Sequence, residues 1–394
     1  TLPPAEQVAF WSARLKPDTP DYLTLTTLAG AYLSQARETG DAAAYARAEE
    51  SLRRALALNP RYEPANALLG SVLIGQHAFA EALNRAETAL AANPDAPQAL
   101  AAAGDAHLEL GHYAEAEAAY TRLLDLTPGG PVYSRLSRLA WLQGRPDEAI
   151  DWMRRAADET VALDLGGEGL AWYRFQLGEL YFNQGDLRRA ARWYGEAEQA
   201  LPGYYLASAG LGKVEAARGD LAAAIVRYEA LVGRLPQPGF VATLGDLYAL
   251  NGDTDAAQRQ YDTVAFIQQL DAAQRVLYDR AVAVFFANHN TNLDTALAYA
   301  ERELAARQDI YAYDTLAWVL YRLGRFDEAR AASDRALALG TPDAHLYYHS
   351  GLIAAAQGDA AQATTHLRRA LELNPHFDLL QVEEARRALA ALEQ

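Results

Sequence analysis

The chain has 394 residues, a formal net charge of −16 and a pI near 5.0, and 51% of its residues are hydrophobic. A nucleic acid or an anionic membrane surface attracts a basic protein surface, so this acidic composition predicts neither as a partner. The absence of cysteine excludes disulfides, thiolate metal ligands and cysteine nucleophiles.

Nothing in the sequence predicts membrane insertion. No stretch approaches the ~18 consecutive apolar residues of a spanning helix, and the apolar run at 281–287 is typical of a buried helix. The chain begins at Thr1 and not at methionine, which we interpret as the removal of a leader or tag. The basic residues are almost all arginine, a usage that we interpret as bacterial, and the localisation is left open.

In chain order, the sequence predicts a first helix at residues 4–16, ten helix pairs, and a last amphipathic helix at 378–393. The pairs are expected to begin near residues 22, 63, 97, 130, 171, 205, 238, 277, 310 and 344. Seven extra residues lie within 158–170, a stretch whose three glycines break a helix. The eighth pair is degenerate, with Val284 where a glycine is expected.

The pairs share an internal repeat with a period of 34 residues, as from Gly70 to Gly104 and from Gly178 to Gly212. Each unit carries a glycine, an alanine further on, and a proline that ends the second helix. The small residues are Gly70 and Ala82, Gly104 and Ala116, Gly178 and Ala190, Gly212 and Ala224, Gly245 and Ala257, and Gly351 and Ala363. A large side chain at these positions would overpack the contact between helices, at roughly 1–3 kcal/mol.

This pattern resembles the tetratricopeptide repeat (TPR) family, in which each unit is two antiparallel helices, A and B. The resemblance implies an all-α, right-handed superhelix (α-solenoid) of about ten repeats with capping helices at both ends. It divides the chain into an N-terminal cap (1–21), repeats 1–4 (22–161), a glycine-rich insertion (162–170), repeats 5–7 (171–270), a degenerate repeat 8 (271–309), repeats 9–10 (310–377) and a C-terminal cap (378–394).

The resemblance also implies a concave groove lined by positions 2, 5, 9 and 12 of the A helices. The predicted groove residues at or beside these positions are Arg138, Trp141, Trp172, Phe175, Phe182, Tyr278, Phe285, Tyr311, Asp314, Trp318, Tyr321 and Arg322. Aromatic residues with scattered arginines are typical of binding hot spots. We therefore predict a non-catalytic scaffold or adaptor that binds a protein or peptide in this groove. The alternative is that these aromatics fill gaps between neighbouring A helices or are covered by the insertion.

Two further functions stay open: a small-ligand or sensor module near residues 158–182, and an assembly role through the outer surface and the caps. The oligomeric state is also left open. We expect no enzyme and no cofactor, because the segment 163–169 lacks the lysine and the preceding strand of a phosphate-binding loop. No serine lies in a nucleophile-elbow context.

His345 and His349 lie four residues apart, a spacing by which two histidines on a helix share a metal ion. The stretch lacks the glutamate base of a metalloprotease, so these residues are only a weak metal candidate. We predict instead that they line the groove, titrate as the pH falls toward 6, and lie near Asp314 of the previous repeat.

Overall fold

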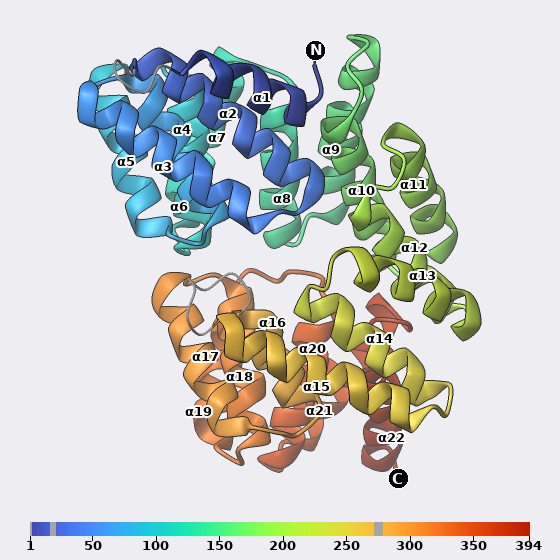
Figure 1. Ribbon diagram of the computed structural model, residues 1–394. Coiled ribbons are helices and arrows are strands. Elements are labelled where there is room, and N and C mark those ends of the chain that lie inside the picture. The colour runs from blue at the N-terminus through green and yellow to red at the C-terminus, as the bar shows by residue number, and fades with distance from the viewer. Residues whose placement is uncertain (1, 16–20, 272–278) are drawn as a thin grey trace. The chain divides into compact units, whose positions relative to one another are not determined.

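The computed structural model describes residues 2–15, 21–271 and 279–394, and these residues form helices and no strand (Figure 1). The helices are α1 (Pro4–Arg14), α2 (Tyr22–Thr39), α3 (Ala42–Leu58), α4 (Glu63–Gly75), α5 (Phe79–Ala92), α6 (Pro97–Glu109), α7 (Tyr113–Leu126), α8 (Gly130–Leu142), α9 (Pro146–Ala162), α10 (Glu168–Asn183), α11 (Leu187–Ala200), α12 (Tyr205–Ala217), α13 (Leu221–Arg234), α14 (Pro238–Leu250), α15 (Thr254–Asp271), α16 (Asp279–Asn288), α17 (Leu293–Ala306), α18 (Ile310–Arg322), α19 (Phe326–Ala336), α20 (Ala344–Ala356), α21 (Ala360–Leu373) and α22 (Gln381–Leu392). The predicted all-α helical-repeat fold is confirmed.

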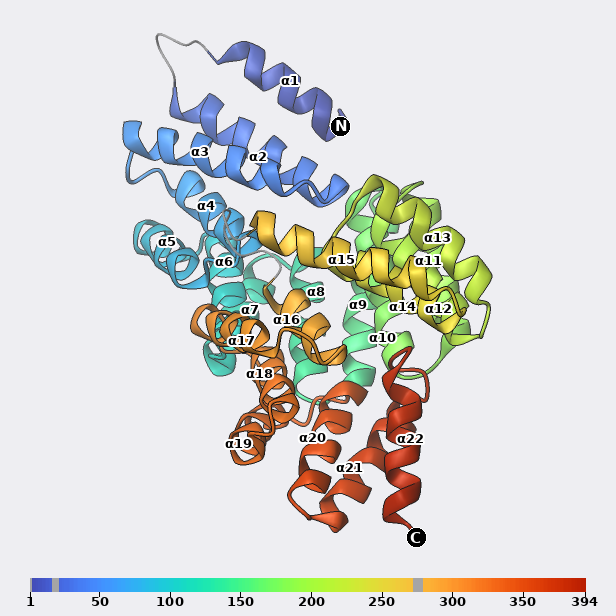
Figure 2. The ribbon, with the colours of Figure 1, turned by 60° about the horizontal axis from the view of Figure 1, so that its bottom comes forward.

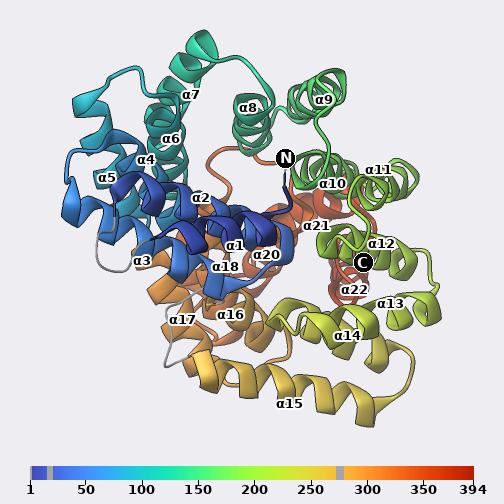
Figure 3. The same ribbon diagram turned by 45° about the horizontal axis from the view of Figure 1, so that its top comes forward.

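The chain divides into two compact units, Thr1–Leu139 and Ala140–Gln394, and the boundary lies inside α8. In the first unit, α1, α2 and α3 lie side by side (Figure 3), and the pairs α4/α5 and α6/α7 follow. In the second unit, helix pairs continue to α20/α21, and α22 packs on α21 beside α20 (Figure 2).

Helix A packs closely on helix B of the same repeat because a glycine faces an aromatic ring. A Cβ atom built on Gly178 would lie 2.4 Å from the ring of Tyr194, which is closer than any real contact. The same relationship recurs in other repeats, with Gly104 facing Tyr120, Gly212 facing Tyr228 and Gly245 facing Tyr261. These contacts explain four of the predicted repeat glycines, while a Cβ atom on Gly351 would meet Leu367 at 2.7 Å and one on Gly70 would meet Ala102 at 3.2 Å.

A Gly-Asp dipeptide forms the turn between helices A and B in several repeats. Gly185 adopts φ 73°, the left-handed conformation that ends α10, and the Asp186 carboxylate then accepts the Arg189 N–H at the start of α11. The same turn occurs at Gly40–Asp41, Gly219–Asp220, Gly252–Asp253 and Gly358–Asp359. The sequence thus specifies both the stop of one helix and the start of the next.

Two hydrogen bonds join repeats of the second unit that are far apart in the sequence. The Thr341 hydroxyl donates to the Leu142 carbonyl, and Asn374 Nδ2 donates to the Phe182 carbonyl at 2.9 Å. Both acceptors lie at the C-terminal end of an A helix, where carbonyls lack intrahelical partners. The turns of repeats four and five therefore lie against segments of repeats nine and ten.

Candidate functional site

The structure buries much of the predicted groove in the second unit. Trp141, Phe182, Phe285, Asp314 and Trp318 are less than a tenth exposed. The predicted groove residues that are half-buried are Trp172, Phe175, Tyr311, Tyr321 and Arg322. Tyr278 lies outside the described residues. The role of all these residues in partner binding stays a prediction.

Arg138 is the predicted groove residue that belongs to the first unit. Its guanidinium lies on the surface and pairs with the buried carboxylate of Glu109 at 2.6 Å. Arg135 lies one turn earlier on the same helix and forms two hydrogen bonds with the Asp105 carboxylate, at 2.7 and 2.8 Å. Both arginines therefore join α8 to α6.

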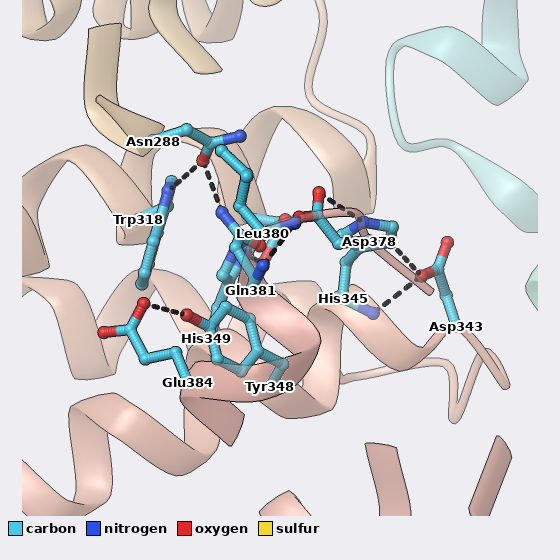
Figure 4. Close-up of polar contacts among 11 residues, drawn as sticks. Asn288, Trp318, Asp343, His345, Tyr348, His349, Asp378, Leu380, Gln381 and Glu384 are labelled. Atoms are coloured by element: carbon cyan, nitrogen blue, oxygen red, sulfur yellow. Dashed lines mark hydrogen bonds and ion pairs between the residues drawn. The ribbon is translucent and has the colours of Figure 1, made fainter. Parts of the chain in front are cut away.

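Trp318 lies at the centre of a polar and aromatic cluster in repeats eight to ten (Figure 4). Its side chain is fully buried, and its Nε1 donates to Asn288 Oδ1 at 2.8 Å. The ring stacks on His349 with centroids 4.1 Å apart, and the Arg322 guanidinium lies 4.3 Å from the ring centroid. Residues of this chain therefore occupy the space around Trp318.

The C-terminal cap completes this cluster. Gln381 at the start of α22 donates from Nε2 to Asn288 Oδ1 at 2.6 Å, and Tyr348 donates to Glu384 Oε2 at 2.8 Å (Figure 4). The Asp378 carboxylate accepts the Gln381 backbone N–H and so caps α22. The cap helix thus binds residues of α16 and α20.

His349 is buried and lies 2.9 Å through Nδ1 from an oxygen of Asp314. The predicted proximity of Asp314 is confirmed. This contact accounts for one ring nitrogen, and Trp318 covers a face of the ring.

His345 lies between two carboxylates, with Nδ1 3.4 Å from Asp343 and Nε2 3.7 Å from Asp378. Desolvation opposes the charged imidazolium, but the two carboxylates outweigh it and raise the pKa of His345 to about 10. The prediction that His345 titrates near pH 6 is therefore wrong. A metal ligand must be a neutral imidazole, and no group of three or more potential ligands is arranged for a metal ion in the described part of the chain.

An acid, a tyrosine and a base form a repeated triplet between neighbouring repeats. Tyr194 donates to Glu179, which also pairs with Lys213 of the next A helix at 2.7 Å. Burial, and then the charge of Glu179, raises the pKa of Tyr194, so its hydroxyl remains a donor. The other triplets are Tyr120–Asp105–Arg135 and Tyr261–Asp246–His289. The sequence prediction missed them, although each acid precedes its tyrosine by 15 residues.

Half-buried aromatic rings remain on the A helices of repeats five to seven. We name Trp172, Phe175, Tyr205 and Phe240 the aromatic row. Trp172 and Phe175 pack against the buried cluster around Tyr204, and the rings of Tyr205 and Phe240 meet edge to face at 6.2 Å. Each of the four rings keeps part of its surface exposed, which a partner side chain can cover.

Family models described as tetratricopeptide repeat match residues 68–131, 175–237 and 315–377, and a second such model matches residues 131–202. The chain belongs to the tetratricopeptide repeat family. TPR arrays are, in general, scaffolds for protein interaction, and the predicted family and fold are both confirmed. Among the described residues, no helix combines the length and the apolarity needed to cross a bilayer.

One curated relative is the probable biofilm formation methyltransferase WspC of Pseudomonas putida, which is 38% identical over 83 residues. The match covers 20% of this TPR chain and 20% of the relative, so the chain spans about a fifth of that protein's length.

Solved structures of similar fold include a human IFIT1 dimer with PPP-AAAA, at a TM-score of 0.49 and 12% identity, with 94% of each chain covered. TTC0263, a thermophilic TPR protein in Thermus thermophilus, has a TM-score of 0.42 and 19% identity, with 52% of this chain and 99% of that chain covered. A chain of the APC/C hetero-tetramer Cut9-Hcn1 has a TM-score of 0.42 and 17% identity, with 93% of this chain and 76% of that chain covered.

Proposed function

We propose that this TPR protein is a non-catalytic scaffold that binds a protein or peptide segment on the aromatic row of repeats five to seven. The observation that supports this proposal is the contrast in exposure along the predicted groove. Trp172 and Phe175 keep part of their surface exposed, whereas Phe285 and Trp318 are covered by residues of the chain itself.

Half-buried aromatic rings are suited to anchor a partner. A half-buried ring is already held by its neighbours, so binding orders few side chains and removes the remaining apolar surface from water. Trp172 and Phe175 lie one helical turn apart on α10 and pack on the same cluster. Partner side chains at a similar spacing would contact both rings.

The polar neighbours of the row favour a peptide over a flat apolar surface. Glu179 and Lys213 form an ion pair one turn beyond Phe175, and Nζ of Lys213 also lies 4.8 Å from the centre of the Phe182 ring. Both charged groups are partly exposed. They therefore offer one acceptor and one donor to the backbone of a bound segment.

We also propose that the chain has no catalytic activity of its own and does not bind nucleic acid. The P. putida relative is named a methyltransferase, but its match to this chain covers 83 residues, 20% of each sequence. The ligand PPP-AAAA is named for the human IFIT1 dimer. The net charge of −16 opposes a phosphate backbone on this chain.

The test uses peptides from a random phage-displayed library, selected on the wild-type chain after depletion on a Trp172→Ala/Phe175→Ala variant. Synthetic copies of the selected peptides are then measured by fluorescence anisotropy. We expect each single alanine variant to weaken binding about tenfold or more, as for a central hot-spot ring.

Trp193→Ala is the matched control, because Trp193 is a half-buried tryptophan on helix B of the same repeat. It should bind the peptides as the wild type does, and circular dichroism should show all variants folded. If depletion leaves no peptides, or if Trp193→Ala weakens binding as much as Trp172→Ala, the aromatic row is not the binding surface.

A further inference from the structure

Three exposed aliphatic side chains lie at the end of α9 and in the turn that follows it. Val161, Leu163 and Leu165 are 53%, 61% and 57% exposed, although each is large and apolar. α9 has 17 residues, whereas α11 and α13, the B helices of the next two repeats, have 14 each. The repeat therefore gains about one extra helical turn, and this extension carries apolar side chains into water.

Backbone hydrogen bonds hold this turn in a defined conformation. Leu165 N–H donates to the Thr160 carbonyl at 2.9 Å, and Asp164 N–H donates to the Val161 carbonyl at 3.0 Å. This pair of bonds is the Schellman motif, which needs a left-handed residue at the helix end. Asp164 takes that conformation with φ 52°, where glycine is the usual residue. The apolar side chains are therefore presented by an ordered backbone, which reduces the entropy lost on binding.

The turn is also acidic. Asp158 and Asp164 are exposed, Glu159 is half-buried, and no lysine or arginine occurs between Arg155 and Arg174. A second copy of the chain would place the same carboxylates against each other, in a protein of net charge −16. An anionic membrane surface would repel them in the same way. Charge complementarity therefore selects a basic partner.

We propose that residues 158–165, the acidic-apolar turn, bind a protein segment that combines large apolar side chains with arginine or lysine. Val161, Leu163 and Leu165 contact the apolar side chains of this segment, and the carboxylates of Asp158 and Asp164 pair with its basic side chains. Apolar contact supplies the affinity, and the opposite charges select the partner and speed the encounter. The turn contains no residue of the aromatic row, so this inference does not depend on the proposed function.

Three matched variants separate these contributions. Val161→Ser/Leu163→Ser/Leu165→Ser removes the apolar surface and keeps the charges. Asp158→Asn/Asp164→Asn removes the charges and keeps the turn, because asparagine also tolerates the left-handed conformation. Val226→Ser is the control, since Val226 is 67% exposed on α13, away from the turn in sequence.

The probes are peptides from a random phage-displayed library, selected on the wild type after depletion on the triple serine variant. We expect these peptides to combine lysine or arginine with large apolar residues. Their affinity should fall about tenfold or more in the triple variant and stay unchanged in Val226→Ser. The asparagine variant should bind several-fold more weakly at low salt, a difference that should vanish near about 0.5 M NaCl.

Each of the following results would overturn the proposal. Depletion leaves no peptides, the selected peptides lack basic residues, or the asparagine variant binds like the wild type at low salt. Sedimentation shows a wild-type dimer that the triple variant loses, which would assign the turn to a second copy. Wild-type chain binds phosphatidylserine vesicles and the triple variant does not, which would assign it to a membrane.

Discussion

Asn374 donates a hydrogen bond to the backbone carbonyl of Phe182 at 2.9 Å, across 192 residues of sequence. Asn374 is 1% exposed and also accepts the His376 N–H through Oδ1 at 2.9 Å. The Asn374 side chain therefore makes one local and one long-range hydrogen bond. The long-range contact ties the end of repeat ten to the end of α10.

The first prediction concerns this contact. Replacing Asn374 with alanine removes this long-range bond and leaves the buried Phe182 carbonyl with the Gly185 N–H as its donor, and we expect a loss of about 0.5–1.5 kcal/mol in the free energy of unfolding. Urea denaturation followed by circular dichroism measures the loss. Asn93→Ala is the control, because Asn93 makes the same local bond, to the Asp95 N–H at 3.2 Å, but lies exposed at the end of α5. Equal losses in both variants would show that the long-range bond contributes nothing.

A second prediction concerns the close contact between helices A and B in repeat five. A methyl group at Gly178 would meet the Tyr194 ring at 2.4 Å, so Gly178→Ala should lower the free energy of unfolding by roughly 1–3 kcal/mol. Gly195 lies inside α11 with nothing within 4 Å of an added Cβ, so Gly195→Ala should raise it by about 0.5–1 kcal/mol. Thermal melts of the two variants should shift in opposite directions, and a stabilised Gly178→Ala would contradict the packing.

The third prediction concerns His289, whose two ring nitrogens both face acceptors. Nε2 lies 2.9 Å from Asp246 Oδ1 and Nδ1 lies 2.8 Å from the Phe285 carbonyl, which suits a protonated ring that donates twice. Burial of the ring opposes its charge, but Asp246 outweighs burial and raises the pKa of His289 above 6.5.

A raised pKa stabilises the folded chain below the unfolded value of 6.5, and this contribution is lost as the pH rises through the folded-state pKa. His289→Gln should therefore destabilise the chain by about 1–2 kcal/mol at about pH 5.5 and by less at about pH 8.5. Urea titrations at both pH values, with His366→Gln as a control, measure the difference. A larger effect at the higher pH would contradict the assigned charge.

The helix pairs could be predicted because their signals are local. Pairs expected near residues 22, 63 and 97 begin at Tyr22, Glu63 and Pro97. The fifth pair begins at Glu168, a little before residue 171, because Gly167 with φ 76° ends the preceding turn and the chain becomes helical directly after it. Gly-Asp turns and repeat glycines specify these elements within a few residues of sequence.

The burial of the predicted groove could not be read from the same signals. Trp141 Nε1 donates to the Tyr311 hydroxyl at 3.3 Å across 170 residues, and Thr341 contacts the Leu142 carbonyl across 199. A repeat of 34 residues describes how each unit meets its neighbour and does not describe where distant units meet. The sequence analysis left open that the aromatics fill gaps between neighbouring A helices, as Trp318 does against His349, but no local signal indicated the contacts across 170 and 199 residues.

Oxidative footprinting of the tryptophans tests the central claim most directly. The chain is exposed to hydroxyl radicals with and without a peptide selected against the aromatic row, and oxidation is measured by mass spectrometry. Trp172 should be oxidised in the free chain and protected by the peptide, while the fully buried Trp318 should stay unoxidised in both states. Protection of Trp318 by the peptide, with no change at Trp172, would contradict the account and return partner binding to repeat nine.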